Sequence, residues 1–250
     1  MHSRSKDEPG HGSAAALDLG HDVDREVSIR LRTVLHEIQA PILSLRLRID
    51  ALVEQSPAAL RSLVEDCQTE LRQLDEVSRR LLQFDRLQNT EAEHAPVDWN
   101  RLFGRLGSRF EPIAASAGVQ LVLAPAPAGP TFVSDAERIH LILNNLLDNA
   151  LRHAPKGTVV RLDCSASGEG VRLTVRDQGP GLPPEELPHL FDPFRRATAD
   201  EHAGRSGFGL GLSLCRTAAT ALGGHLEIDS ELGNGTSAGV FLPRRLSTDP

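Results

Sequence analysis

The chain has 250 residues, of which 40% are hydrophobic and 24% charged, a composition typical of a soluble globular protein with one large domain or two small ones. Its formal net charge is −7 and it has no run of basic residues, which argues against nucleic acid or an anionic membrane as a partner. No apolar run approaches the ~20 residues of a membrane span and residues 1–16 lack the apolar core of a signal peptide, so we expect a soluble, cytoplasmic chain.

Two long amphipathic helices are expected in residues 23–92, after a lead-in at 1–22 whose His, Ser, Gly and charged residues predict disorder. Apolar residues recur in steps of three and four over 27–52 and again over 60–84, and Pro57 separates the two series. Helices joined by so short a turn form an antiparallel hairpin. A lone hairpin leaves much of its apolar stripe in water, so we expect two chains to pair into a four-helix bundle.

A different pattern follows the predicted linker at 93–97. Residues 98–246 alternate short strands with helices, which is typical of a layered α/β sandwich, and residues 247–250 form a tail. Asp98 is a candidate N-cap for a helix that runs through Ala117. The remaining helices are expected at Asp135–His153 and Leu210–Leu222, and the strands at Gln120–Leu123, Thr158–Cys164, Val171–Arg176, His225–Ile228 and Ala238–Leu242. The chain is thus expected to be a multidomain α+β protein.

The three cysteines, Cys67, Cys164 and Cys215, are odd in number and far apart in the sequence. They lack the CxxC spacing of a metal or redox site. We therefore expect reduced residues of the protein core.

His36 is the first candidate for chemistry. It lies outside the apolar stripe of the first predicted helix, so its imidazole should reach solvent, where a neutral ring nitrogen is a competent nucleophile near neutral pH. Glu37 follows directly. Taken alone, the pair describes a surface histidine beside a surface glutamate, in a chain with ten histidines. Only the motifs further along the chain favour a reactive histidine.

Asparagines on a predicted helix begin a candidate nucleotide site. Asn145 and Asn149 are four residues apart and therefore share one face of the helix. Arg152 follows one turn after Asn149 and can reach a phosphate group. The alternative is that these residues form a polar cluster at a helix N-terminus, or an amide pair that bonds backbone groups.

Glycine-rich turns supply the rest of this candidate site. Asp177 ends a predicted strand and enters a turn with Gly179 and Gly181, where a carboxylate can accept a hydrogen bond from the adenine amine and glycines let the backbone approach a ligand closely. Phe194 precedes a long loop and a second glycine-rich stretch, which opens a helix whose backbone N–H groups can bind phosphate oxygens. That stretch contains Gly207, Gly209, Leu210, Gly211 and Leu212. Thr236, in the turn GNGT, completes the set.

The chain has five motifs in a fixed order: LHEIQAPI around His36, NNLLDNALRHA, DQGPGLP, FDPFRRA and GFGLGLSL. Through these motifs the chain resembles the kinase core of a two-component sensor histidine kinase over roughly residues 23 to 243. The resemblance implies a phosphoacceptor hairpin followed by an ATP-binding domain of the GHKL type. It also implies that Glu37 orients the His36 ring and accepts its proton, and that Asn149 binds Mg²⁺ at the ATP phosphates. Relatives that hydrolyse ATP with water carry a glutamate where Asn145 stands, so the asparagine disfavours attack by water.

The function implied is ATP-dependent autophosphorylation of His36 by a protein-histidine kinase that acts as a homodimer. The phosphoryl group then passes to an aspartate of a separate response regulator. Input comes either from a separate sensor protein or from further domains of a longer chain. The family often has Thr or Asn where this chain has Ala40, so we expect little phosphatase activity toward the regulator.

Leu43 and Leu47 are candidate docking residues for that regulator. On an ideal helix both point within about 20° of His36 and lie outside the stripe formed by Ile42, Leu45, Ile49 and Leu52. Exposed apolar surface of this kind is often an interface. The alternative is that the stripe of the bundle is broad enough to bury both leucines.

Two other functions stay open at this point. One is an ATP-binding dimer that acts as a scaffold with little catalysis. The other is a chaperone-like or serine-kinase relative of the same ATP fold, which fits poorly with a preceding hairpin that carries His36. Acid lability separates them, because phosphohistidine is lost in acid and phosphoserine survives. Whether phosphorylation runs within or between protomers depends on the handedness of the turn near residues 54–58, which the sequence does not give.

Overall fold

The computed structural model describes residues 42, 43, 45, 47, 49 and 50 of the first predicted helix, and residues 58–125, 131–193, 195 and 209–244. The chain falls into two compact units, one ending at Asp85 and the other beginning at Arg86. The predictions for the lead-in, for residues 23–41, and for Phe194 and Gly207 lie outside the described residues.

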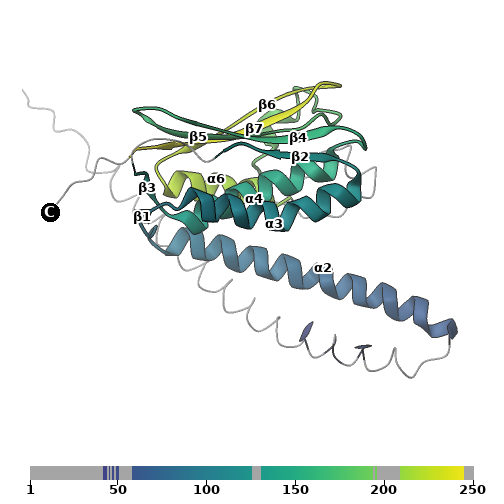
Figure 1. Ribbon diagram of the computed structural model, residues 1–250. Helices are drawn as coiled ribbons and strands as arrows, with labels where there is room; N and C mark the ends of the chain where they lie inside the picture. Colours follow the sequence, from purple (N-terminus) through teal and green to yellow (C-terminus); the bar gives the residue numbers. More distant parts are fainter. Residues whose placement is uncertain are drawn as a thin grey trace, which may run out of the picture. The chain divides into compact units, whose positions relative to one another are not determined.

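The described residues of the first unit are helical (Figure 1). Its main element, α2 (Ala58–Asn89), has 32 residues and begins directly after Pro57, as predicted for the second helix. The described residues of the first predicted helix are also helical, and Asp50 Oδ1 accepts a 2.5 Å hydrogen bond from Gln68 Nε2 of α2. Neither α2 nor any other described helix is both long and apolar enough to cross a membrane.

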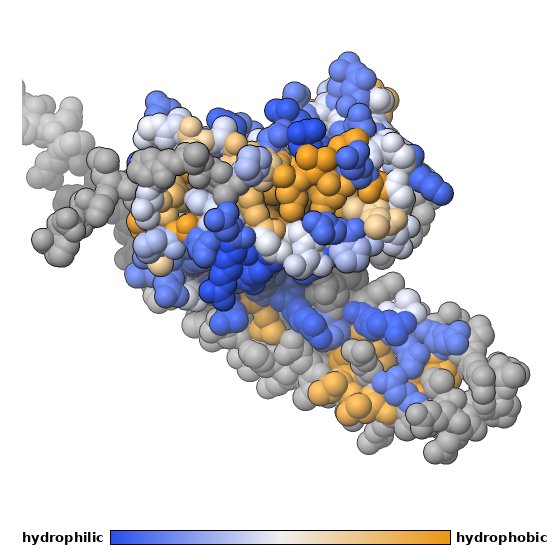
Figure 2. Space-filling model, viewed as in Figure 1, coloured by the Kyte–Doolittle hydropathy of each residue, from blue (hydrophilic) through white to orange (hydrophobic). Residues whose placement is uncertain are grey.

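Apolar side chains are visible at the surface of this helical unit (Figure 2). Ile42 and Leu71 are buried, whereas Leu45 and Leu74 are about half exposed. One chain therefore covers only part of the apolar stripes that the sequence predicts. The pairing of two chains into a four-helix bundle stays a prediction.

The second unit starts with the last residues of α2 and continues into the segment predicted as a linker. Within it β1 (Ala95–Pro96) pairs antiparallel with β3 (Val133–Ser134), and Val97 N–H donates to the Phe132 carbonyl at 2.9 Å. Val97 and Phe132 are buried, and the Trp99 ring lies 5.7 Å from that of Phe132, centroid to centroid. The segment is therefore packed onto the second unit.

A five-stranded sheet, covered on one face by helices, forms the body of the second unit (Figure 1). The strands are β2 (Gln120–Leu123), β4 (Val159–Ala166), β5 (Gly170–Arg176), β6 (His225–Glu231) and β7 (Gly235–Pro243). Their order is β2-β4-β5-β7-β6, with β2 parallel to β4 and the other pairs antiparallel. The helices are α3 (Trp99–Ala117), α4 (Ala136–His153) and α6 (Gly211–Ala221), and a short 3₁₀ helix, η1, spans Leu187–His189.

Alternation along the strands places one row of side chains between the sheet and the helices. Leu173 and Val240 are paired neighbours on this inner face, and both are fully buried, as are Leu143 of α4 and Leu214 of α6. Burying each such side chain stabilises the fold by roughly 1.5–3 kcal/mol. This layered α/β sandwich agrees with the prediction for residues 98–246.

The three cysteines are all described and none forms a disulfide. Cys215 is fully buried, and its thiol lies 3.7 Å from the Ile142 carbonyl. Burial raises the pKa of the half-buried Cys164 thiol to about 11, so it stays protonated at neutral pH. This chemistry fits reduced core residues.

Candidate nucleotide-binding site

Helix α4 positions the two asparagines. Its first turn is capped by Asp135, whose carboxylate accepts hydrogen bonds from two backbone N–H groups of that turn. The amide nitrogen of Asn145 donates to the Leu141 carbonyl at 2.9 Å, which uses one of its two N–H groups. Asn149 is half-buried, and no hydrogen bond joins its side chain to any described residue. The Asn149 amide is therefore available to a ligand.

Asp177 lies directly after β5, at the strand end where the sequence predicts it. One carboxylate oxygen, Oδ1, accepts hydrogen bonds from the backbone N–H groups of Gly179 at 2.8 Å and Thr236 at 3.3 Å. Burial raises the pKa of this carboxyl, and these two N–H groups and the nearby His153 partly oppose that shift. The other oxygen, Oδ2, has no hydrogen bond to a described residue.

The turn after Asp177 is held against the β6–β7 hairpin at two glycines. Gly181 has φ +66° and Gly235 has φ +87°, a left-handed conformation that other residues rarely adopt. A Cβ atom on Gly181 would lie 1.9 Å from the Glu231 carbonyl oxygen, and one on Gly235 would lie 2.2 Å from that of Asp177. Both glycines are therefore sterically required for the loop to approach the hairpin.

Ser230 of β6 is a residue of this site that the sequence did not indicate. Its hydroxyl oxygen accepts from Leu182 N–H at 2.9 Å and lies 2.8 Å from the Thr236 hydroxyl, while the hydroxyl donates to the Gly235 carbonyl at 3.0 Å. Ser230 thus ties the Asp177 turn to the start of β7. Ser230 reaches the Asp177 turn because the register of β6 with β7 pairs it with Thr236. No local sequence motif identifies Ser230 as part of the site.

The second glycine-rich stretch enters α6. Gly209 has φ +67°, Leu210 is buried, and Gly211 and Leu212 are half-buried at the first turn of the helix. No side chain caps this helix start, since the Leu210 position makes no side-chain hydrogen bond to it. The N–H groups of the first turn lack intrahelical partners and can bind an anion.

Several other predicted site residues make contacts of their own or fall outside the described part of the chain. Arg152 forms an i,i+4 ion pair with Asp148 on α4. His36 and Glu37 fall among the residues that the structure does not describe, as do Phe194 and Gly207. Leu43 and Leu47 belong to the helical unit, where their side chains are 57% and 62% exposed.

The donor set suits Mg²⁺ bound together with a nucleotide better than a metal held by protein alone. Among the described residues, no group of three or more His, Cys, Asp or Glu could hold a metal ion. Asn149 offers one neutral oxygen. Mg²⁺ is commonly bound through one or two protein oxygens, waters and the phosphates of its substrate. The residues present therefore fit this ion.

The described residues of the second unit include a half-buried carboxylate with one oxygen available, an amide with no hydrogen bond to a described residue, and glycine-rich backbone at a helix start. Residues 134–246 match the family described as histidine kinase-, DNA gyrase B-, and HSP90-like ATPase. This match covers every described residue of the arrangement.

Similarity to individual proteins extends over most of the chain. The alginate biosynthesis sensor protein KinB of Pseudomonas aeruginosa is 29% identical, with 94% of this chain and 41% of KinB covered. The adaptive-response sensory kinase SasA of Synechococcus sp. (strain JA-3-3Ab) is 28% identical, with 85% of this chain and 58% of SasA covered. This chain thus spans less than two thirds of the length of both relatives.

Solved structures show the same fold. The crystal structure of full-length ShkA in complex with AMPPNP aligns with a TM-score of 0.74 and 29% identity, over 88% of this chain and 47% of that one. The Acinetobacter baumannii histidine kinase AdeS aligns with a TM-score of 0.60 at 21% identity, over 84% of this chain and 98% of that one. Residues 134–246 thus match the ATPase family shared by histidine kinases, DNA gyrase B and HSP90, and the chain is similar over most of its length to sensor histidine kinases.

Proposed function

We propose that the chain is an ATP-dependent protein-histidine kinase that phosphorylates His36 and passes the phosphoryl group to an aspartate of a separate response regulator. The observation that carries this proposal is Asp177, whose carboxylate is held through one oxygen while the other is left for a ligand. Incubation with ATP labelled in its γ-phosphate, followed by a panel of receiver domains, tests it. Label that survives acid treatment, or that never passes to any receiver domain, would contradict it.

Each part of the site has a task in this reaction. Asp177 Oδ2 accepts the hydrogen bond of the adenine amine, and the backbone N–H groups at the start of α6 face phosphate oxygens. Asn149 holds Mg²⁺, which neutralises phosphate charge when bound. Asn145 is a neutral amide, which is not basic and so cannot take a proton from water. This favours phosphorylation of a histidine over hydrolysis.

Replacing Asp177 by asparagine should weaken nucleotide binding by roughly 1–3 kcal/mol, the cost of a lost hydrogen bond to a charged group. The asparagine oxygen can still accept the two backbone N–H groups, so the turn should stay folded. Titration with a fluorescent nucleotide measures the loss. Equal affinity of the two proteins would mean that the adenine pocket lies elsewhere.

The same carboxyl predicts a pH dependence. Because burial raises its pKa, acidification protonates Asp177 at a higher pH than an ordinary aspartate, and nucleotide affinity should fall there. Folding stability should change with pH in the opposite direction to nucleotide affinity. Because the pKa of Asp177 is higher in the folded than in the unfolded protein, its contribution to stability is present at acid pH and is lost as the pH rises through the folded-state pKa. Affinity measured against pH should show this step in the unmodified protein and not in Asp177→Asn.

In this proposal, one side of the first predicted helix contacts the second chain of a homodimer and the opposite side contacts the response regulator. Leu43, Leu45 and Leu47 are all at least half exposed in a single chain. On an ideal helix Leu45 points about 160° away from the direction of the other two. Leu45 lies in the predicted bundle stripe, whereas Leu43 and Leu47 share the direction of His36. A second chain would cover the first side and a receiver domain the second.

Lysine at both Leu43 and Leu47 should therefore block transfer to the regulator while autophosphorylation and dimerisation persist. Charge on this face prevents the burial that an apolar interface requires. Sedimentation and labelling measure the two properties separately. The matched control is Leu45→Lys, which should instead weaken the dimer. Monomers from the Leu43/Leu47 variant would place both leucines in the bundle core.

A further inference from the structure

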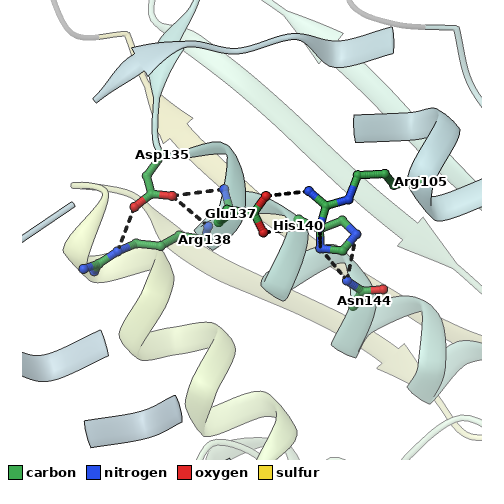
Figure 3. A network of polar contacts seen from close by, with 6 residues as sticks. All are labelled: Arg105, Asp135, Glu137, Arg138, His140 and Asn144. Atoms are coloured by element: carbon green, nitrogen blue, oxygen red, sulfur yellow. Dashed lines mark hydrogen bonds and ion pairs between the residues drawn. The ribbon is translucent and has the colours of Figure 1, made fainter. Parts of the chain in front are cut away.

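An ion pair at the start of α4, between Asp135 and Arg138, bonds to backbone groups at and just after the end of α2, and no part of the proposed nucleotide site uses it. Arg138 Nε lies 3.2 Å from Asp135 Oδ2, and the two side chains are only 7% and 13% exposed (Figure 3). The Arg138 guanidinium also donates to the carbonyl of Leu87, at 3.4 Å, and to that of Thr90. Asp135 Oδ2 accepts from the Glu93 N–H at 3.1 Å.

These contacts match the electrostatics of two helix ends. The last carbonyls of α2 have no partner within the helix and carry partial negative charge, which a guanidinium offsets. The first N–H groups of α4 carry partial positive charge, and Asp135 accepts from two of them at 3.0 Å. These two side chains thus provide hydrogen-bond partners for carbonyls at the end of α2, for N–H groups at the start of α4 and for the Glu93 N–H. We name Asp135 and Arg138 the helix clamp.

The clamp is connected to the nucleotide site by a continuous helix. α4 has 18 residues, about 27 Å at 1.5 Å per residue, and it carries Asn149 in its last turns. This helix has little freedom to slide against its neighbours, because Ile139, Ile142 and Leu143 are fully buried in a close-packed core. A displacement of the α2 end relative to α4 is therefore a displacement relative to the site.

We propose that Asp135 and Arg138 are positioning residues for phosphoryl transfer, because they fix the helix that follows the His36 segment to the helix that carries Asn149. This inference rests on the proposed function. Neither residue touches the nucleotide site, so their loss leaves nucleotide binding in place and slows only the transfer. Misplacement of reacting groups by about 1 Å can lower a rate about a hundredfold.

Two variants of the full chain test the clamp from its two sides. Arg138→Met keeps a long side chain that fills the buried space but removes all donors. Asp135→Ser keeps a good N-cap for α4 but removes the acceptor for Arg138 and Glu93. In both, nucleotide affinity should stay within about twofold while His36 labelling at saturating ATP slows at least about tenfold. Arg138→Lys, with one donor group, should recover part of the rate.

Arg105→Met is the matched control. Arg105 of α3 pairs with Glu137 of α4 at 2.5 Å, but these side chains are 44% and 73% exposed, so the same substitution should change neither property. An unchanged labelling rate in both clamp variants would overturn the proposal. So would a parallel loss of affinity, which would indicate a merely structural role.

Amide hydrogen exchange supplies a readout that does not depend on kinase activity. The Glu93 N–H should exchange at least about tenfold faster in Asp135→Ser, because its acceptor is gone, and the N–H groups of the α2 end should follow in Arg138→Met. Unchanged exchange in both variants overturns the clamp even if the unmodified protein labels normally. If the unmodified protein takes no label at all, the proposed function is wrong instead. Hydrogen exchange in the two variants would then still show whether Asp135 and Arg138 hold the end of α2.

Discussion

Glutamine in place of His36 should abolish labelling of the protein by γ-labelled ATP and leave nucleotide affinity within about twofold of its original value. Labelling requires a ring nitrogen that can form a phosphoramidate, and an amide nitrogen is not such a nucleophile. Affinity should persist because every described residue of the nucleotide site lies in the second unit, beyond Arg86. Filter-bound label and a fluorescent-nucleotide titration, run on the same preparation, measure the two properties.

His225 provides the matched control for this experiment. It is 58% exposed, and its Nε2 lies 3.0 Å from a carboxylate oxygen of Glu227, so it is also a histidine with a glutamate beside it. His225→Gln should label normally. Acid-stable label on His36→Gln, or loss of label in the His225 variant, would show that His36 is not the acceptor.

Local sequence patterns predicted most of the second unit. The strand expected at 120–123 is β2 at those same residues, and Asp98 caps α3 by accepting from the Arg101 N–H at 3.0 Å. The helix expected from Asp135 is α4, with that aspartate as its cap. Each of these features depends on neighbouring residues alone: alternation, apolar spacing or a capping side chain.

Features that depend on contacts between distant residues were not predicted. β1 and β3 have two residues each, too few to show any alternation, and they form only because residues 95 and 134 meet. Ser230 enters the site through the register of β6 with β7. Arg138 resembles an ordinary surface arginine in the sequence, because nothing local shows that the end of α2 covers it.

The candidate site divides in the same way. The sequence could propose Asn149 and Asp177 because their motifs are short and their chemistry is specific. It could not show that Asp177 presents one oxygen while two backbone N–H groups hold the other, since one of those groups comes from Thr236, on a different strand. Nor could it show that Arg152 pairs with Asp148, because an exposed arginine can reach several partners.

Alanine in place of Asn149 should lower Mg²⁺-dependent nucleotide affinity at least about tenfold, in line with the loss of a metal ligand or of the groups that support one. The Asn149 side chain makes no hydrogen bond to a described residue, so its removal leaves no protein group unsatisfied. The thermal unfolding midpoint without nucleotide should therefore stay within about 2 °C. Titration with a fluorescent nucleotide, with Mg²⁺ and with a chelator present, separates the metal-dependent part.

Asn144→Ala is the control on the same helix. Asn144 lies next to Asn145, but its amide contacts His140 at 2.9 Å, as part of the polar network that reaches Arg105 of α3 (Figure 3). This substitution should leave Mg²⁺-dependent affinity unchanged. The Asn149 variant should bind no better with Mg²⁺ than with the chelator, because the protein oxygen that links the ion to α4 is gone. An Asn149 variant that keeps its full Mg²⁺ dependence would show that other residues hold the ion, and the assignment of Asn149 as its ligand would be wrong.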